Sequence, residues 1–293
     1  MAVSTPWVEQ LNPVRGHTIA GALDLVERAA LEDGSRAISE QALLTLRRDS
    51  SGASTYAIVG EDNAFIGFAL VSGGSCELVV DPRRRRLGYG TALVDRVLSD
   101  SSQSLNLWAH GSHPGALAIA ASHHLIATRR LWQMYAPLDQ ALPELSLPDG
   151  VSVRPFEVGI DEQAWLALNA AAFAAHPEQG AWSEADLLAR EREPWFDPAG
   201  FLLAEREGGR VVGFHWTKVH LAGELGEVYV VGVHPSEQGT GLGSRLTLAG
   251  LRYLKEHGIR TVMLYVDETN LAAIRVYERL GFIHEYTDIC FTR

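Results

Sequence analysis

The chain has 293 residues, enough for about two domains of ordinary size, and 46% of its residues are hydrophobic. Acidic residues outnumber basic ones by 36 to 25, which gives a formal net charge of −11. This balance argues against a nucleic-acid partner, because binding to phosphate groups needs a basic face. The basic run Arg83–Arg86 is too short to supply such a face.

Cysteine content and hydropathy exclude several further classes of protein. The two cysteines, Cys76 and Cys290, lie far apart in the chain and show neither a disulfide framework nor metal-ligand spacing, so no metal is expected. No apolar stretch approaches the roughly 18 residues of a membrane span. The first residues also lack the charged and apolar regions of a signal peptide. We therefore expect a cytoplasmic protein without membrane contact.

The order of predicted elements indicates two similar halves. We expect a first domain over 1–138, a linker over 139–149 and a second domain over 150–293. The segment 137–150 holds three prolines and ends in Asp-Gly, which is typical of a linker. The first half repeats the order of the second with shorter elements. In the second half the patterns predict strands at 151–156, 201–206, 210–219, 225–234, 261–266 and 284–292, and helices near 161–175, 183–192, 242–257 and 270–280. This order indicates an α/β (α+β) fold, a mixed sheet covered by helices, in each half.

A motif shared by the halves supports this duplication. Arg85, Gly88 and Gly90 correspond to Gln238, Gly241 and Gly243, each at an offset of 153 (238−85, 241−88, 243−90). In both places an apolar strand is followed by a turn with proline, a polar loop and an apolar-periodic helix. A single offset near half the chain length indicates a duplicated domain and not a solenoid.

The glycine-rich loop Gln238–Gly243 joins a predicted strand to a predicted helix. Glycines can adopt positive φ and present backbone N–H groups, and such donors at a helix N-terminus bind pyrophosphate. Gly232, in the strand before the loop, predicts a bulge that splays the strand. A second helix begins at Asn270 and continues with the spacing Asn-x6-Tyr-x3-Gly-Phe.

On these residues the sequence resembles the Gcn5-related N-acetyltransferase family. The loop signature [Gln/Arg]-x-x-Gly-x-[Gly/Ala] is matched by Gln238–Gly243 and again by Arg85–Gly90, and the later helix is similar over Asn270–Phe282. The resemblance covers both halves and implies two tandem acetyltransferase domains. It implies that the loop binds the pyrophosphate of acetyl-CoA and that the splayed strand binds its pantetheine arm. The second loop here reads Ser-Glu-Gln-Gly-Thr-Gly, with fewer cations than is usual in the family.

The positions implied to contact acetyl-CoA fall in both halves. In the second half they are Val231, Gly232, Val233, Gln238, Gly239, Thr240, Gly241, Leu242, Gly243, Ser244, Asn270, Leu271, Ala272, Ala273, Ile274 and Arg275. In the first half they are Leu78, Val79, Val80, Arg86, Leu87, Gly88, Tyr89, Gly90 and Thr91.

The chemistry of acetyl transfer is assigned to the second half. Tyr277, beside the expected thioester, is the candidate acid that protonates the leaving thiolate. Glu227 is the candidate base, because a glutamate in an apolar strand is costly unless it has a function or a partner. It precedes Val231 by four residues, which predicts a shared face. In the first half Ala120 replaces the tyrosine, so we expect that half to bind acetyl-CoA without catalysis.

A closer resemblance suggests the acceptor. It rests on AAFAAHPEQGAW (171–182), EPWFDPAG (193–200), GFHWTKVH (213–220) and GEVYVVGVHP (226–235). These segments are similar to a tandem-domain branch of the family that uses acetyl-CoA to acetylate the cysteinyl amine of 1D-myo-inositol 2-(L-cysteinylamino)-2-deoxy-α-D-glucopyranoside. The substrate contacts that this resemblance implies are Glu40, Glu178, Lys218, Glu227 and Tyr265.

Two other functions are compatible with the sequence. The chain could acetylate another amine, such as an aminoglycoside or a protein N-terminus, because a fold alone does not define a substrate. It could also be a non-catalytic sensor of acyl-CoA, but the joint presence of Glu227 and Tyr277 argues against that role. A duplicated domain can replace contacts between subunits, so we expect a monomer.

Overall fold

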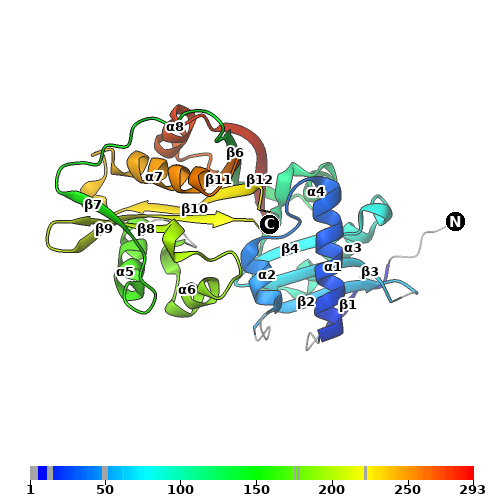
Figure 1. Ribbon diagram of the computed structural model, residues 1–293. Helices are drawn as coiled ribbons and strands as arrows, with labels where there is room; N and C mark the ends of the chain where they lie inside the picture. Colours follow the sequence, from blue (N-terminus) through cyan, green and yellow to red (C-terminus); the bar gives the residue numbers. More distant parts are fainter. Residues whose placement is uncertain are drawn as a thin grey trace. The chain divides into compact units, whose positions relative to one another are not determined.

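The computed structural model describes residues 6–11, 16–47, 52–61, 63–174, 176, 179–220 and 223–293. The chain forms two compact units, and Figure 1 shows their elements. Unit 1 contains Met1–Leu131 together with Tyr286–Arg293, and unit 2 contains Trp132–Glu285. In the described part of the chain no helix is long and apolar enough to cross a membrane.

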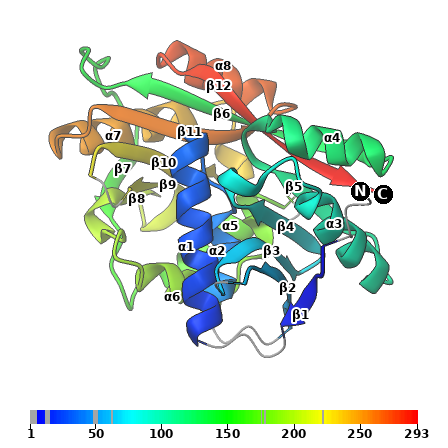
Figure 2. The same ribbon diagram turned by 90° about the vertical axis from the view of Figure 1, so that its right-hand side faces the viewer.

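Unit 1 is a mixed sheet with helices on both faces. Its elements are β1 (Glu9–Leu11), α1 (Gly16–Asp33), α2 (Glu40–Arg47), β2 (Ser54–Val59), β3 (Phe65–Ser72), β4 (Ser75–Val80), α3 (Tyr89–Asp100), β5 (Asn106–Ala109), α4 (Pro114–Ser122) and the first part of β6 (Ile126–Pro137). The strand order is β1-β2-β3-β4-β5-β12, and β4–β5 is the parallel pair among otherwise antiparallel neighbours. Figure 2 shows α1 and α3 with β2, β3 and β4 between them.

Two apolar clusters hold the helices of unit 1 to its sheet. Leu25 and Ala29 of α1 pack with Phe68 on one face. On the other face Leu93 and Val97 of α3 pack with strand residues of β2, β4 and β5. Because side chains alternate along each strand, both faces of the sheet are apolar and both need a helix layer.

Unit 2 repeats this plan at a larger scale. Its elements are β7 (Val151–Pro155), α5 (Glu162–Ala172), α6 (Glu184–Glu191), β8 (Phe201–Arg206), β9 (Arg210–Val219), β10 (Leu225–Val233), α7 (Leu242–Glu256), β11 (Thr261–Asp267), α8 (Leu271–Arg279) and the first residues of β12 (Ile283–Thr292). The strands β7 to β10 form antiparallel neighbours, and β10 pairs with β11 in parallel. The mixed α/β fold predicted from the sequence is confirmed, and its second-half elements begin and end within three residues of the predicted bounds.

The last strand ends in the unit to which the sequence did not assign it. Ile289, Cys290 and Phe291 of β12 pair with β5, and Ile289 and Phe291 are buried in the unit 1 core. Residues 286–293 therefore belong to the first unit, whereas the sequence assigned them to the second. The predicted linker 139–149 lies in unit 2, where residues 138–150 form neither helix nor strand. Local patterns predict a strand but do not say which sheet it will join.

A fully buried histidine lies between the sheet and α7 of unit 2. His215 of β9 has no exposed surface, and within the described residues neither of its ring nitrogens has a hydrogen-bond partner. Its imidazole occupies the space beside Gly250, where a Cβ would come within 2.0 Å of Nε2. Burial lowers the pKa of His215 from 6.5 to about 3, because the charged ring would be desolvated.

We expect His215 to make unit 2 sensitive to acid. Its folded pKa is depressed, so between pH 6.5 and about 3 the unfolded state binds the extra proton and stability falls as the pH falls. The maximal contribution to the slope is about 1.4 kcal/mol per pH unit. Replacing it by leucine (His215→Leu) should remove this contribution. Urea unfolding of both proteins at pH 7, 6 and 5, followed by tryptophan fluorescence, measures the difference.

Buried Trp165 and Trp216 make this fluorescence a reporter of unit 2. His257→Leu is the matched control, because His257 is exposed at the end of α7. An equal pH dependence in wild type and His215→Leu would contradict the expectation.

Candidate active site

The parallel pairing of β10 with β11 in unit 2 ends before β10 does. The register between β10 and β11 runs from Leu225 opposite Thr261 to Val228 opposite Leu264. A bulge follows between Val228 and Val230, and from there β10 continues its pairing with β9. In the described residues no β10–β11 pairing follows Val228, so backbone groups near Val231 are not used in a ladder with β11. They are available to hydrogen-bond an extended ligand that enters between the strands.

This bulge corrects two details predicted from the sequence. The bulge was expected at Gly232, but Gly232 serves another purpose: a Cβ there would lie 2.6 Å from the ring of Phe214. The extra residue also shifts the two-residue period, so Glu227 and Val231 do not share a face. Val231 packs in the clusters beneath α7, whereas Tyr229 packs on the face that carries α5 and α6.

The glycine-rich loop lies at the start of α7. Gly239 and Gly241 both have φ of +81°, and Gly241 caps the helix without a side-chain hydrogen bond. The first N–H groups of α7 are therefore directed into the loop, and the helix dipole adds positive potential there. The predicted positions Gln238 to Gly241 form the turn, and Leu242 to Ser244 form the first helical turn.

Arginines compensate for the scarcity of cations in the loop sequence. Glu237, directly before the loop, is paired with Arg206 at 2.7 Å and with Arg210 at 3.3 Å, which offsets its negative charge. Arg245 donates to the carbonyl of Gly241 at 3.1 Å, so a guanidinium lies at the loop. Arg245 is not among the residues predicted from the sequence. Its place one helical turn beyond Gly241 was the available signal.

The second helix of the motif places its tyrosine in the interior. Asn270 caps α8 by accepting from the N–H of Ala273 at 3.2 Å, and the predicted positions Leu271 to Arg275 form the first turns. Tyr277 is 8% exposed and packs in one cluster with Val228. Burial raises the pKa of Tyr277 to about 12, so its hydroxyl is protonated at neutral pH. In the described residues this hydroxyl has no hydrogen-bond partner.

The opposite face of the sheet carries charged groups among aromatic rings. Glu227 is 7% exposed, and its Oε2 lies 3.0 Å from Nε2 of His220. Lys218 stands opposite Glu227 in the β9–β10 register, and its ammonium lies 4.6 Å from the ring centroid of Trp195 and 5.2 Å from that of Tyr229. These are cation–π distances. The tyrosine hydroxyl accepts from an arginine of α6, Arg190, at 2.6 Å.

The implied substrate residues are distributed as follows. Lys218, Glu227 and Tyr265 share the face that carries α5 and α6, since the alternate residues Leu264 and Val266 of β11 pack on the other face. Glu178 lies outside the described residues. Glu40 is the first residue of α2 in unit 1. His220, Trp195 and Arg190 were not predicted from the sequence, although the first two lie in the distinctive segments GFHWTKVH and EPWFDPAG.

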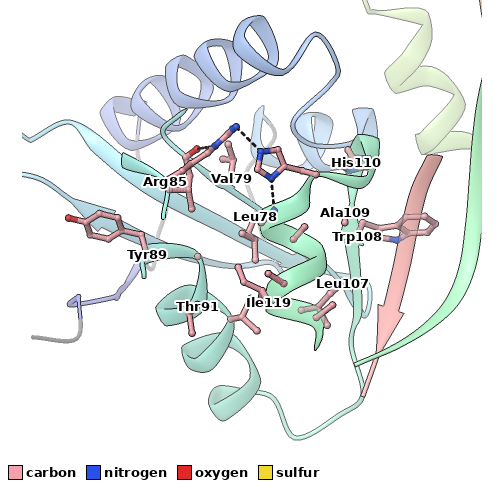
Figure 3. A pocket seen from close by; sticks show the side chains of 18 of the residues that line it. Leu78, Val79, Arg85, Tyr89, Thr91, Leu107, Trp108, Ala109, His110 and Ile119 are labelled. Carbon is pink, nitrogen blue, oxygen red and sulfur yellow. Dashed lines mark hydrogen bonds between the residues drawn. The ribbon is translucent and has the colours of Figure 1, made fainter. Parts of the chain in front are cut away.

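Unit 1 contains a similar opening between its parallel strands. The β4–β5 register ends at Glu77 opposite Trp108, and a cavity of about 380 Å³ follows. Figure 3 shows Leu78 of β4, Leu107 of β5 and Ile119 of α4 around this cavity. Of the nine positions predicted for acetyl-CoA here, all but Leu87 line the cavity; the eight are Leu78, Val79, Val80, Arg86, Gly88, Tyr89, Gly90 and Thr91.

Charged side chains lie at one end of this cavity. Arg85 forms a forked ion pair with Asp33, at 2.6 and 2.8 Å, and its Nη1 lies 3.2 Å from Nε2 of His113. His113 caps α4 as Asn270 caps α8. Seven residues after each cap stand Ala120 and Tyr277, so unit 1 has a methyl group where unit 2 has a phenol.

A closed ion cluster occupies the α2 side of the unit 1 sheet. His110 lies between Glu77, at 3.0 Å, and Asp288, at 2.8 Å, while Arg36 pairs with Asp288 at 3.0 Å. The N–H and hydroxyl of Ser39 donate to Glu77. Burial would lower the pKa of His110, but the hydrogen bonds to Asp288 and Glu77 outweigh it and raise the pKa. Two cations then balance two carboxylates, so the cluster needs no further ion.

We expect Asp288→Asn to destabilise unit 1 by about 3–5 kcal/mol, because it leaves buried positive charge without its partner. Asparagine keeps the shape of the side chain and can still accept from the N–H of Gly111, which donates to Asp288 at 2.9 Å. Hydrogen exchange of the β5 amides measures the opening free energy of unit 1. Asp95→Asn is the control, since Asp95 pairs with His123 at the surface. Equal exchange rates in the two variants would show that the cluster contributes little.

The chain was compared with known proteins. Residues 164–282, within unit 2, match the Acetyltransferase (GNAT) family. The chain is 50% identical to a mycothiol acetyltransferase of Thermobispora bispora over 92% of this chain and 94% of that protein. It is 51% identical to one of Thermomonospora curvata over 93% of each.

Solved structures share the architecture. A GCN5-related N-acetyltransferase from Sphaerobacter thermophilus has a TM-score of 0.71 at 24% identity, over 98% of this chain and 95% of that one. A tandem GNAT protein from the clavulanic acid biosynthesis pathway has a TM-score of 0.72 at 22% identity, over 98% of both chains. The chain belongs to the GNAT family of acetyltransferases and is an enzyme of that class. Within the family, the relatives it resembles at 44–51% identity over nearly its full length are named mycothiol acetyltransferase.

Proposed function

We propose that the chain transfers an acetyl group from acetyl-CoA to the cysteinyl amine of 1D-myo-inositol 2-(L-cysteinylamino)-2-deoxy-α-D-glucopyranoside, giving mycothiol and CoA. The similarity to mycothiol acetyltransferases along the whole chain supports this substrate. The observation that carries the proposal is the position of Glu227, on the face with Lys218 and Tyr229, beside the point where β10 leaves β11. The gap where β10 separates from β11 is the proposed acetyl-CoA slot, and the face with Lys218 and Tyr229 is the proposed acceptor surface. The two meet at β10.

Each group of the site has a task in this reaction. The amine nitrogen attacks the thioester carbonyl, and a backbone N–H of Val231 to Val233 stabilises the negative charge on the carbonyl oxygen. Glu227 takes a proton from the amine. The carbon–sulfur bond then breaks, and Tyr277 gives its proton to the leaving thiolate. Glu227 then releases its proton to solvent, and Tyr277 takes one back from solvent. The net reaction converts the amine and acetyl-CoA into the amide and CoA.

The acceptor is a sugar with many hydroxyls and one amine. Carboxylates such as Glu227 accept hydrogen bonds from hydroxyls and from the amine, and Lys218 donates to hydroxyl oxygens. Half-buried aromatic rings such as Trp195 suit contact with the apolar C–H face of a pyranose. Glu40, Glu178 and Tyr265 are proposed as further contacts.

For unit 1 we propose binding of acetyl-CoA without catalysis. Its cavity is lined by the residues that correspond to the donor slot of unit 2. Ala120 cannot donate a proton. The carboxylate of Glu77 in β4 is already paired with His110 and accepts from Ser39. Because acetyl-CoA is a metabolite of the cell interior, we propose that the enzyme acts in the cytoplasm, and we propose that it does so as a monomer.

Purified protein should release CoA rapidly from acetyl-CoA in the presence of the cysteinyl glucosaminyl-inositol. It should do so slowly, if at all, with a panel of aminoglycosides or with peptides that carry a free N-terminus. A thiol reagent cannot be used directly, since the acceptor carries a thiol, so chromatographic separation of CoA is the measurement. Turnover only with another amine would rule out the proposed acceptor. No turnover with any amine would favour the alternative of a non-catalytic acyl-CoA sensor.

Replacing either proposed proton-transfer group should lower kcat more than it changes substrate binding. We expect Tyr277→Phe and Glu227→Gln each to reduce kcat by about 10²–10⁴-fold, with the Kd for acetyl-CoA within about twofold of wild type by calorimetry. Tyr253→Phe and Glu224→Gln are the matched controls, because Tyr253 bonds to Asp197 and Glu224 is exposed. Unchanged turnover in the first two variants would refute the assignment.

A further inference from the structure

The backbone of His220, the residue that contacts Glu227, is held by hydrogen bonds between the end of β9 and the start of β10. The N–H of His220 donates to the carbonyl of Leu225 at 2.9 Å, and its own carbonyl accepts from the N–H of Gly223 at 2.7 Å. The backbone of His220 is thus held on both sides, directly after the end of β9. Its ring therefore reaches Glu227 from a preset position.

In the contact between Glu227 and His220, the histidine is the donor. A carboxylate can only accept, so the 3.0 Å contact between Oε2 of Glu227 and Nε2 of His220 requires a proton on Nε2. The side chain of Glu227 is 9% exposed and that of His220 is 36% exposed. A carboxylate so deeply buried among rings is costly in its ionised form unless it receives hydrogen bonds. His220 supplies one from the solvent side.

The neighbouring cation lies over aromatic rings. Lys218 is the residue directly opposite Glu227, but its ammonium lies over the rings of Trp195 and Tyr229. That position suits it to contact the acceptor molecule. The N–H of an imidazole, unlike a mobile ammonium, is directional, because the ring is rigid and its backbone is fixed.

We propose that His220 is a positioning residue for the acetyl transfer: it holds the carboxylate of Glu227 in one orientation for the acceptor amine. This inference rests on the proposed function, since it assigns His220 a role through Glu227. No bond to His220 forms or breaks in the reaction. Its contribution is the hydrogen bond from Nε2, which any side chain with an N–H at that place can imitate.

Two substitutions separate this role from simple packing. His220→Leu keeps much of the volume but removes the donor, and we expect kcat to fall 10- to 100-fold while the Kd for acetyl-CoA stays within twofold. His220→Gln places an amide N–H near the position of Nε2 and should recover kcat to within about threefold of wild type. His257→Gln is the control for a histidine outside the site. Equal losses in the leucine and glutamine variants, or no loss in either, would overturn the proposal.

A second measurement does not depend on the acceptor. Long-range ¹⁵N–¹H spectra of the imidazole rings, with His220→Gln used to identify the signals of His220, report which nitrogen carries a proton. We expect a proton on Nε2 in wild type and a changed tautomer balance in Glu227→Ala. If wild type fails to acetylate the cysteinyl amine, the proposed substrate is wrong while this spectrum still tests the pair. An Nε2 without a proton, or signals unaffected by Glu227→Ala, would overturn the pairing itself.

Discussion

Between Val228 and Val230, β10 takes in one extra residue, and after this bulge its parallel ladder with β11 is not continued. A parallel pair in the middle of a sheet normally uses every backbone group, so the end of the ladder leaves peptide groups that a ligand can satisfy. The glycine loop and the N-terminus of α7 follow directly from the end of this strand. The proposed acetyl-CoA site, the glycine loop and the proposed acceptor face therefore all depend on where β10 separates from β11.

The two units use one backbone plan for different chemistry. In both, a parallel pair ends early and a positive-φ glycine, Gly88 or Gly241, caps the following helix. Beside these slots, unit 2 has Tyr277 and a carboxylate within an aromatic surface. Unit 1 has Ala120 and a neutral ion cluster. In the proposed function, unit 1 therefore binds acetyl-CoA without catalysis, because proton transfer depends on single side chains while binding depends on the backbone.

Three histidines show how the surroundings decide what an imidazole does. His215 is buried beside Gly250 and has no hydrogen-bond partner in the described part of the chain, so its pKa falls to about 3 and it remains neutral. His110 is equally buried, but two carboxylates contact it, so its pKa rises and it carries charge. His220 is partly exposed and contacts a single buried carboxylate. Burial disfavours the charged ring of His215 and of His110, and the neighbouring acids decide whether that cost is overcome.

The sequence by itself determined the duplication, the order of helices and strands, the loop glycines and the helix caps. These features depend on local rules: the period of apolar residues, the need for positive φ and the capping of helix ends. It also pointed to Glu227 and Tyr277, since a charge in an apolar strand and a tyrosine at a fixed distance from a helix cap are visible in one dimension.

Only the tertiary structure decided the position of the bulge, the face on which Glu227 lies, the partner His220 and the unit that β12 joins. A bulge is set by how two strands pair, and one residue of shift reverses every side chain after it. Arg245 and His220 likewise gain their roles from atoms brought close by packing. The cluster of Glu77, His110 and Asp288 joins residues that are up to about 200 positions apart in the sequence, and no local pattern can specify such a contact.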